Sequence, residues 1–300
     1  MLFTYFCYMK ITGLLLILSM IFLSCEKTIT IEPTIREPLL VVDGVIEDGV
    51  APIIYLSKSI NYFSTLSPAV VAASIVRNAK ITLSNGARTV TLKEYIIPIT
   101  GTFSVSYYST DISNPAARMV GEQQKTYTLN IEVDNKIYTS VTSIPKLTKL
   151  VDSLWWEPVP RLEDTGRAFL MIKLTDPPGY GNYIRYFTKV NREAFKPGEN
   201  SVYDDQLIDG TTYNVQVDQG RDRNNAEDYR RSFARGDTVT LKFANIDKAT
   251  YDFWRTLEFG YQSVGNPFAS PVTVLGNVNN KALGAFCGYA VKYKTLIIPK

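Results

Sequence analysis

TYTLNIEVDNKIYTSVTSI, residues 126–144, is the stretch that decides the fold. Apolar and polar residues alternate along both of its arms, as Leu129 and Ile131 show on the first arm, and Asp134-Asn135 stands between the arms. A period of two indicates strands with one buried and one solvated face, and Asp and Asn favour the tight turn that joins antiparallel strands. The stretch therefore predicts a β-hairpin in an antiparallel sheet.

Short β-rich runs lie on the N-terminal side of this hairpin. We expect strands at residues 39–46, 52–59, 79–83, 88–92 and 102–108. Asn85-Gly86, between the third and fourth of these runs, is the strongest short hairpin signal in the sequence, whereas residues 61–74 have the pattern of an irregular loop. Strands and turns at such close spacing predict an immunoglobulin-like or transthyretin-like antiparallel sandwich over residues 39–145.

A second β-rich domain is expected over residues 146–300. Its strand candidates are residues 168–174, 183–190, 238–243, 282–293 and 296–298, and residues 197–210 and 217–236 have the composition of charged loops. A helix is predicted near 247–261, because large apolar side chains recur there every three to four positions and Asp247 can cap the first turn. The fold class is therefore mainly β, with one aromatic helix.

Trp155-Trp156 lies early in this second domain. Adjacent residues of a strand point to opposite faces, so at most one of the two indoles enters a given core. The other is either a plug between domains or a platform on which a ligand stacks, and the sequence leaves both readings open. Trp155 and Trp156 are therefore our candidate binding residues.

MKITGLLLILSMIFLSC, residues 9–25, has the pattern of an export signal. Lys10 supplies the positive charge, about 13 mostly apolar residues follow, and Ser24-Cys25 ends the run. A cysteine directly after the apolar core is the acceptor expected in a bacterial lipoprotein, so we expect lipid on Cys25. An ordinary cleaved signal and an uncleaved anchor are the alternatives, and the second is disfavoured because a spanning helix needs ~20 residues.

The segments on either side of this signal complete the N-terminal prediction. Residues 1–8 place mostly apolar side chains ahead of Lys10, whereas a signal carries its charge first, so Met9 is the expected start and Met1 the alternative. Residues 1–24 are then the signal peptide. Residues 25–38 are polar and contain two prolines, which predicts a lipidated tether.

The chain contains no histidine. This composition removes Ser-His-Asp and Cys-His catalysis, together with the commonest ligand of zinc and of transition metals. Carboxylate pairs, Ser-Lys arrangements and all-oxygen metal sites remain as the enzyme chemistries open to it.

Three cysteines are present, Cys7, Cys25 and Cys287. With lipid on Cys25, the mature chain has no internal pair to oxidise, which excludes a disulfide framework. Cys287 stands in the apolar run LGAFCGYAV, and we expect it to pack as a small hydrophobic side chain.

The charged residues give little support for a metal or nucleic-acid site. A net charge of +3 is too small to indicate binding to nucleic acid. Residues 217–236 carry several acids, but arginines interleave them and the spacing of a calcium loop is missing. We therefore expect a solvated loop there, and no metal or cofactor.

Three stretches have a familiar order: LLVVDGVIEDGVAPIIYLSKSINYF at 39–63, AKITLSNGARTVTL at 79–92 and NPFASPVTVLGNVNNKALGAFCGYA at 266–290. Together with the lipoprotein signal they resemble a Bacteroidota lipoprotein family catalogued as domain of unknown function 4249. The resemblance implies an outer-membrane lipoprotein, often encoded near TonB-dependent receptors. It supplies no biochemical activity and no site residues.

We therefore expect a lipid-anchored binding or accessory protein of the outer membrane, not an enzyme, that partners a TonB-dependent transporter in capture or uptake. The 19 tyrosines suit contact with a ligand or another protein. A structural subunit of an envelope assembly is the alternative. A carboxylate-based glycosidase is a third reading, with candidate acids but no spacing that selects a pair. Those acids are Glu157, Glu163, Asp176 and Asp204.

Overall fold

A computed structural model describes residues 37–61, 64–100, 103–111, 113–160, 166–222, 231–266, 268–270 and 272–300. The expected signal peptide, Cys25 and most of the tether lie outside the described residues. Residues 37–300 form one unit. Within the part of the chain that is described, no helix has the length and apolar character needed to cross a membrane.

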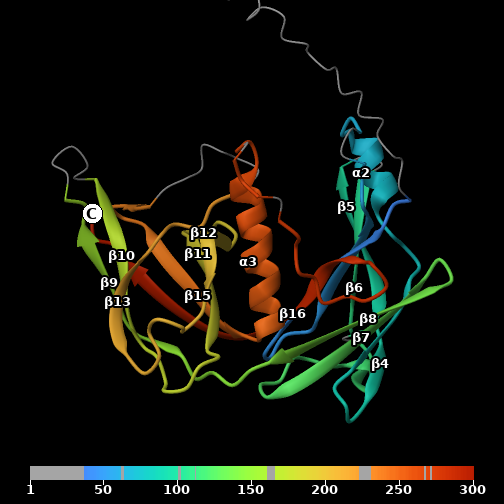
Figure 1. The fold of residues 1–300 in the computed structure, drawn as a ribbon, viewed down its shortest axis with the longest axis horizontal. Coiled ribbons are helices and arrows are strands. Elements are labelled where there is room, and N and C mark those ends of the chain that lie inside the picture. Colours follow the sequence, from blue (N-terminus) through green and yellow to red (C-terminus); the bar gives the residue numbers. More distant parts are fainter. Residues whose placement is uncertain are drawn as a thin grey trace, which may run out of the picture. The chain divides into compact units, whose positions relative to one another are not determined.

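Strands make up most of the described secondary structure, so the mainly β fold class is confirmed (Figure 1). The strands are β1 (Leu40–Glu47), β2 (Ile53–Lys58), β3 (Lys80–Ser84), β4 (Thr89–Thr91), β5 (Lys93–Thr100), β6 (Phe103–Ser109), β7 (Lys125–Val133), β8 (Lys136–Ile144), β9 (Leu150–Pro158), β10 (Arg167–Thr175), β11 (Tyr183–Val190), β12 (Lys196–Tyr203), β13 (Thr212–Val217), β14 (Phe233–Ala234), β15 (Thr238–Ile246) and β16 (Leu283–Ile297). The helices are α2 (Pro68–Ser74), the short 3-10 helix η1 (Pro115–Ala117) and α3 (Lys248–Ser263).

The described strands are arranged in three sheets. Eight strands form the largest, in the order β12-β11-β15-β16-β1-β2-β6-β5. The second has the order β4-β3-β7-β8, and the third joins β13, β10 and β14 with β9 beside β10. Paired strands are antiparallel except β1 and β16, which run parallel with Val42 opposite Gly284. The large sheet thus takes strands from both sides of residue 145, where the domain boundary stays a prediction.

The hairpin of residues 126–144 is confirmed as β7 and β8. Asp134 and Asn135 join the two strands with φ of 50° and 58°. Positive φ at both positions is what a type I′ turn requires, and Asp and Asn tolerate it better than other residues with side chains. Leu129 and Ile131 are buried, so the alternation read from the sequence does separate a core face from a wet face.

Among the described residues, three apolar clusters fill the space between the sheets and under α3. The first lies between the β3–β7 sheet and the N-terminal strands of the large sheet, the second between β10 and the β11–β15 pair, and the third under α3. Strand β16 reaches all three, because Phe286 enters the first, Cys287 the third and Leu296 packs against the second. Cys287 is a free, buried thiol, as expected, and burial raises its pKa to about 12.

Helix α3 is also confirmed, two residues longer than predicted at its C-terminal end. Asp247 caps it, since its Oδ1 accepts a hydrogen bond of 2.8 Å from the Thr250 amide. The other carboxylate oxygen accepts a bond of 2.8 Å from the Ser143 amide on β8. One side chain therefore both starts the helix and fixes it to the hairpin of the second sheet.

Several elements differ from the prediction. Residues 61–74 were expected to be a loop but contain α2, which Ser67 caps by accepting a bond from the Val70 amide. Residues 197–210, also expected to be a loop, begin with most of β12. A proline is tolerated at position 197 because β12 is the edge strand of the large sheet, where one side of the strand needs no ladder partner. The two final strands predicted from the sequence are one continuous strand, β16.

Candidate functional site

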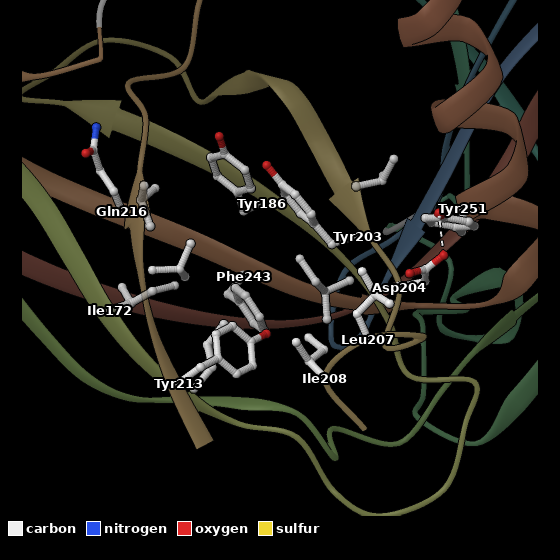
Figure 2. Close-up of a pocket in the computed structure, with 15 residues that line it drawn as sticks. Ile172, Tyr186, Tyr203, Asp204, Leu207, Ile208, Tyr213, Gln216, Phe243 and Tyr251 are labelled. Atoms are coloured by element: carbon white, nitrogen blue, oxygen red, sulfur yellow. Dashed lines mark hydrogen bonds between the residues drawn. The ribbon is translucent and has the colours of Figure 1, made fainter. Parts of the chain in front are cut away.

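A cavity of about 340 Å³, which we call the apolar cavity, lies between the third sheet and the β12-β11-β15 end of the large sheet (Figure 2). Thirteen of its lining residues are aliphatic or aromatic: Ile172, Leu174, Ile184, Tyr186, Val202, Tyr203, Leu207, Ile208, Tyr213, Val215, Val217, Phe243 and Tyr251. Asp204 and Gln216 are the polar lining residues. A concave, mainly apolar space of this volume with a few polar groups is typical of a small-molecule site.

The period of two places these side chains on the cavity face of their strands. Ile172 and Leu174 are two positions apart on β10 and therefore point the same way. The antiparallel register sets Val215 of β13 opposite Ile172, and Tyr213 opposite Leu174. Both strands of the third sheet thus present one continuous apolar surface to the large sheet.

Two stacked tyrosines form the wall on the side of the large sheet. The rings of Tyr186 on β11 and Tyr203 on β12 lie 6.3 Å apart at 20° to each other (Figure 2). The Tyr186 ring lies against the backbone of Gly198, where an added Cβ would be 2.0 Å from the Tyr186 hydroxyl oxygen. Only glycine leaves room for that ring, so Gly198 sets the position of the wall.

Tyr251 brings a polar group from α3 to the edge of the cavity. Its hydroxyl donates a hydrogen bond of 2.8 Å to Asp204 Oδ2 (Figure 2). Burial, and then this bond to the Asp204 carboxylate, raise the pKa of Tyr251 to about 12. The phenol therefore stays protonated at neutral pH and holds the carboxylate in place.

The mouth of the cavity carries apolar side chains that face solvent. Leu207, in the turn after β12, is 97% exposed, Tyr203 is 49% exposed and Val215 is 39% exposed. Apolar groups gathered at the rim of a concave site are a common mark of a binding surface. A ligand that entered here would cover them.

Two aspartates in the same turn fix this rim to the loop between β10 and β11. Asp205 accepts bonds of 2.9 Å from the Gly181 amide and 2.8 Å from the Asn182 amide, and Asp209 accepts one of 2.6 Å from the Gly179 amide. Burial opposes ionisation of Asp205, but these N–H donors outweigh it and lower its pKa. Leu207 and Ile208 lie between the two anchors and are positioned by them.

A buried ion pair, Lys149 with Asp176, lies beneath the rim. Lys149 Nζ is 2.6 Å from Asp176 Oδ1, and both side chains are fully buried. One oxygen from each of Asp176, Asp205 and Asp209 lies within 4.8 Å of the others, a spacing that an oxygen-bound cation could use. Here the Lys149 ammonium already supplies positive charge, and N–H donors occupy Asp205. The Lys149 ammonium therefore compensates negative charge in this group, and the bonds of Asp205 and Asp209 hold the rim.

A second space of about 660 Å³, the adjoining cavity, shares Val202, Tyr203 and Tyr251 with the first. Its remaining lining residues are mostly polar: Asn200, Arg255, Thr256, Glu258, Phe259, Gln262, Val272 and Thr273. The site as a whole therefore has an apolar compartment and a second compartment that also carries polar and charged groups, and a tyrosine from β12 and a tyrosine from α3 lie between them.

Below the adjoining cavity, Arg185 is held in a buried polar network. Its guanidinium lies 3.3 Å from the centroid of the Trp254 ring. It donates bonds of 3.0 Å to Ser201 Oγ and 2.9 Å to the Tyr289 hydroxyl. Ser201 Oγ in turn donates a bond of 2.5 Å to Glu258 Oε1. Hydrogen bonds thus link Arg185, Ser201 and Glu258 in one buried chain.

The candidate tryptophans lie on β9, outside the lining of both cavities. Trp156 packs against the second apolar cluster, and the Arg235 guanidinium lies 4.3 Å from its ring centroid. Trp155 Nε1 donates a bond of 2.9 Å to Glu157 Oε1. The two indoles therefore have different surroundings, as adjacent strand residues should, and their part in binding stays a prediction.

Three of the four candidate acids belong to the described residues. Asp204 lines the apolar cavity, Asp176 forms the buried ion pair with Lys149, and Glu157 is exposed beside Trp155. Glu163 lies outside the described residues, as does the middle of the acidic loop of 217–236. A glycosidase pair among these four stays untested.

The tyrosines and the rim aspartates are the part of the site that sequence reasoning missed. Tyr203 and Tyr213 belong to β12 and β13, in stretches to which no strand was assigned. A signal was present in TYNVQV, residues 212–217, where Tyr213, Val215 and Val217 alternate with polar residues.

A family model matches most of the chain. Residues 26–295 match the model of a family described as Domain of unknown function (DUF4249). Among curated proteins, none matches the chain.

Proposed function

Since the chain belongs to the DUF4249 family, whose description states no activity, we propose a function from the site itself: the protein binds a small, mainly apolar ligand in the apolar cavity. The observation that carries the proposal is the lining, in which thirteen of the fifteen described residues are aliphatic or aromatic. Burying apolar ligand surface against such walls is favourable by about 25 cal/mol for each Å² removed from water. The exposed rim residues Leu207 and Val215 add to that surface.

The cellular setting of the proposal comes from the sequence. With lipid on Cys25, the domain would be held at the outer membrane, and binding would serve a TonB-dependent transporter in capture or uptake. The export signal and the family resemblance support this setting. A structural subunit of an envelope assembly is the competing function, and it has no need of a ligand cavity.

A fluorescent apolar probe tests the binding function. N-phenyl-1-naphthylamine, an uncharged dye that brightens in apolar surroundings, is titrated into residues 26–300. The Val215→Trp variant places an indole at the cavity mouth, and Val141→Trp, on an exposed position of β8, is the matched control. We expect binding to the parent chain and to Val141→Trp, and affinity at least ~10-fold lower for Val215→Trp, because the indole takes the volume that the dye needs. Equal affinity for all three, or none for the parent, would refute the proposal.

The partner is tested separately. The full chain is solubilised from its native membrane with detergent and captured, and the co-purifying proteins are identified. A TonB-dependent receptor in near-equal amount supports the transporter partnership, and recovery of the protein alone speaks against it.

A further inference from the structure

The two cavities differ in polarity but share a boundary. Val202, Tyr203 and Tyr251 line both, so a molecule that passes these residues contacts the apolar and the adjoining cavity at once. The adjoining cavity adds polar groups to its apolar surface, among them Asn200, Gln262 and Arg255. A ligand matched to both spaces has one apolar part and one polar part.

Arg255 indicates which charge the polar part of the ligand carries. It is exposed on α3, and its guanidinium lies 5.8 Å from the centroid of the Tyr251 ring at the boundary. Within the described residues, Arg255 has no acidic partner and donates no hydrogen bond. A guanidinium presents a planar pair of donors that fits a carboxylate or phosphate with two parallel hydrogen bonds.

The acids near the boundary are already engaged. Glu258 accepts bonds from the amide and the hydroxyl of Ser201, and Asp204 accepts the Tyr251 hydroxyl. Within the described lining of the adjoining cavity, Arg255 is therefore the charged side chain that is exposed and has no ionic partner, whereas Glu258 is buried. A ligand with a negative head complements the Arg255 guanidinium.

We propose that the ligand is a single-chain amphiphile whose apolar body occupies the apolar cavity and whose anionic oxygen head binds Arg255 in the adjoining cavity. This inference rests on the proposed binding function and names the ligand class. At ~30 Å³ for each water-sized group, a space of about 340 Å³ holds a body of roughly ten groups. A chain of about ten carbons is therefore the right length for a probe.

The test compares three probes of equal chain length: decanoate, 1-decanol and decyltrimethylammonium. Each is used below its micellar concentration to displace N-phenyl-1-naphthylamine from residues 26–300 at pH 7.5. The domain used contains the whole of the unit 37–300 and its three buried clusters, and circular dichroism checks its folding. Arg255→Gln removes the charge, and Arg255→Lys keeps the charge without the planar pair of donors. Lys136→Gln, which removes one exposed charge on β8, is the control.

We expect decanoate to bind tightest and the ammonium probe weakest. Arg255→Gln should weaken decanoate about 5-fold and leave 1-decanol unchanged, since a partly exposed ion pair has this order of effect. Arg255→Lys should retain part of the preference, and Lys136→Gln should behave as the parent. Raising the salt from about 0.05 M to about 0.5 M should reduce the preference for decanoate, because the ion pair is screened.

Two results overturn the inference and leave the binding function intact. In the first, the dye binds and Val215→Trp blocks it, but decanoate affinity is the same in Arg255→Gln as in the parent. In the second, the ammonium probe displaces the dye better than decanoate. Failure of the dye to bind the parent chain at all would instead remove the binding function, and this inference with it.

Discussion

The Lys149–Asp176 ion pair gives the sharpest prediction for stability. Lys149→Met removes the ammonium and keeps a side chain of similar length. Both partners are fully buried and 2.6 Å apart, so the change leaves an uncompensated carboxylate in the interior, within 4.8 Å of oxygens from Asp205 and Asp209. Breaking one side of a buried pair costs about 3–5 kcal/mol, a large share of the ~5–15 kcal/mol by which a typical domain is stable.

The double variant separates charge from packing. Lys149→Met with Asp176→Leu replaces both ions by apolar groups, and such replacements are often neutral or stabilising. We expect the double variant to recover at least ~2 kcal/mol of the loss. A double-mutant cycle then yields the coupling energy of the pair.

Urea unfolding followed by tryptophan fluorescence provides the measurement. The control is Lys136→Met, which removes an exposed lysine and should stay within about 0.5 kcal/mol of the parent chain. A decrease of less than ~1 kcal/mol in the free energy of unfolding for Lys149→Met would show that the ion pair does not stabilise the fold. A double variant no more stable than the single one would refute the reasoning about charge.

Four further predictions follow from the anchor, the thiol, the cavity wall and the carboxylate cluster. Cys25→Ser should release the protein from the outer-membrane fraction with its circular dichroism unchanged, whereas retention at wild-type level would contradict the lipid anchor. Cys287 should resist a thiol reagent at pH 8 until urea is added, and immediate labelling would contradict its burial. Because burial raises its pKa from 9.0 to about 12, the contribution of the neutral thiol to the free energy of unfolding should be fully present below pH 9.0 and be lost as the pH rises towards 12. Gly198→Ala should cost about 1–3 kcal/mol in urea unfolding and weaken dye binding, since the new methyl overlaps the Tyr186 ring, and an unchanged midpoint would mean that the wall moves freely. Millimolar calcium should leave the Tm unchanged because Lys149 already provides the cation, and a rise would reassign the cluster to a metal.

The elements that the sequence predicted well carry their signals locally. The β7–β8 hairpin has its alternation and its Asp134-Asn135 turn within 19 residues, and α3 has its cap in Asp247. Asn85 at the β3–β4 turn accepts bonds from the two residues that follow Gly86, a contact within four residues. Such features depend on neighbours in the chain, so the pattern suffices.

The candidate site depends on contacts that no local pattern contains. Its walls come from β10 to β13, β15 and α3, and Tyr251 meets Asp204 across 47 residues. Pro197 and Gly198 are typical of a loop, yet both lie in strand β12. The edge position of β12 explains the proline, and the close approach of the Tyr186 ring explains the glycine. The two tryptophans were predicted from their adjacent positions on one strand, whereas the aromatic side chains of the described cavity lining are Phe243 and tyrosines that are spread along the sequence.

The parallel pairing of β1 and β16 has a consequence for the time at which the protein can fold. Val42 and Gly284 meet across about 240 residues, and without the pairing of β1 with β16 the eight-stranded sheet would divide into two four-stranded parts. Closing so long a loop is slow compared with forming a hairpin. During synthesis, the sheet stays incomplete until residues 283–297 have emerged. A chain that cannot complete its largest sheet early stays unfolded for longer, which would suit the export across a membrane that the N-terminal sequence predicts.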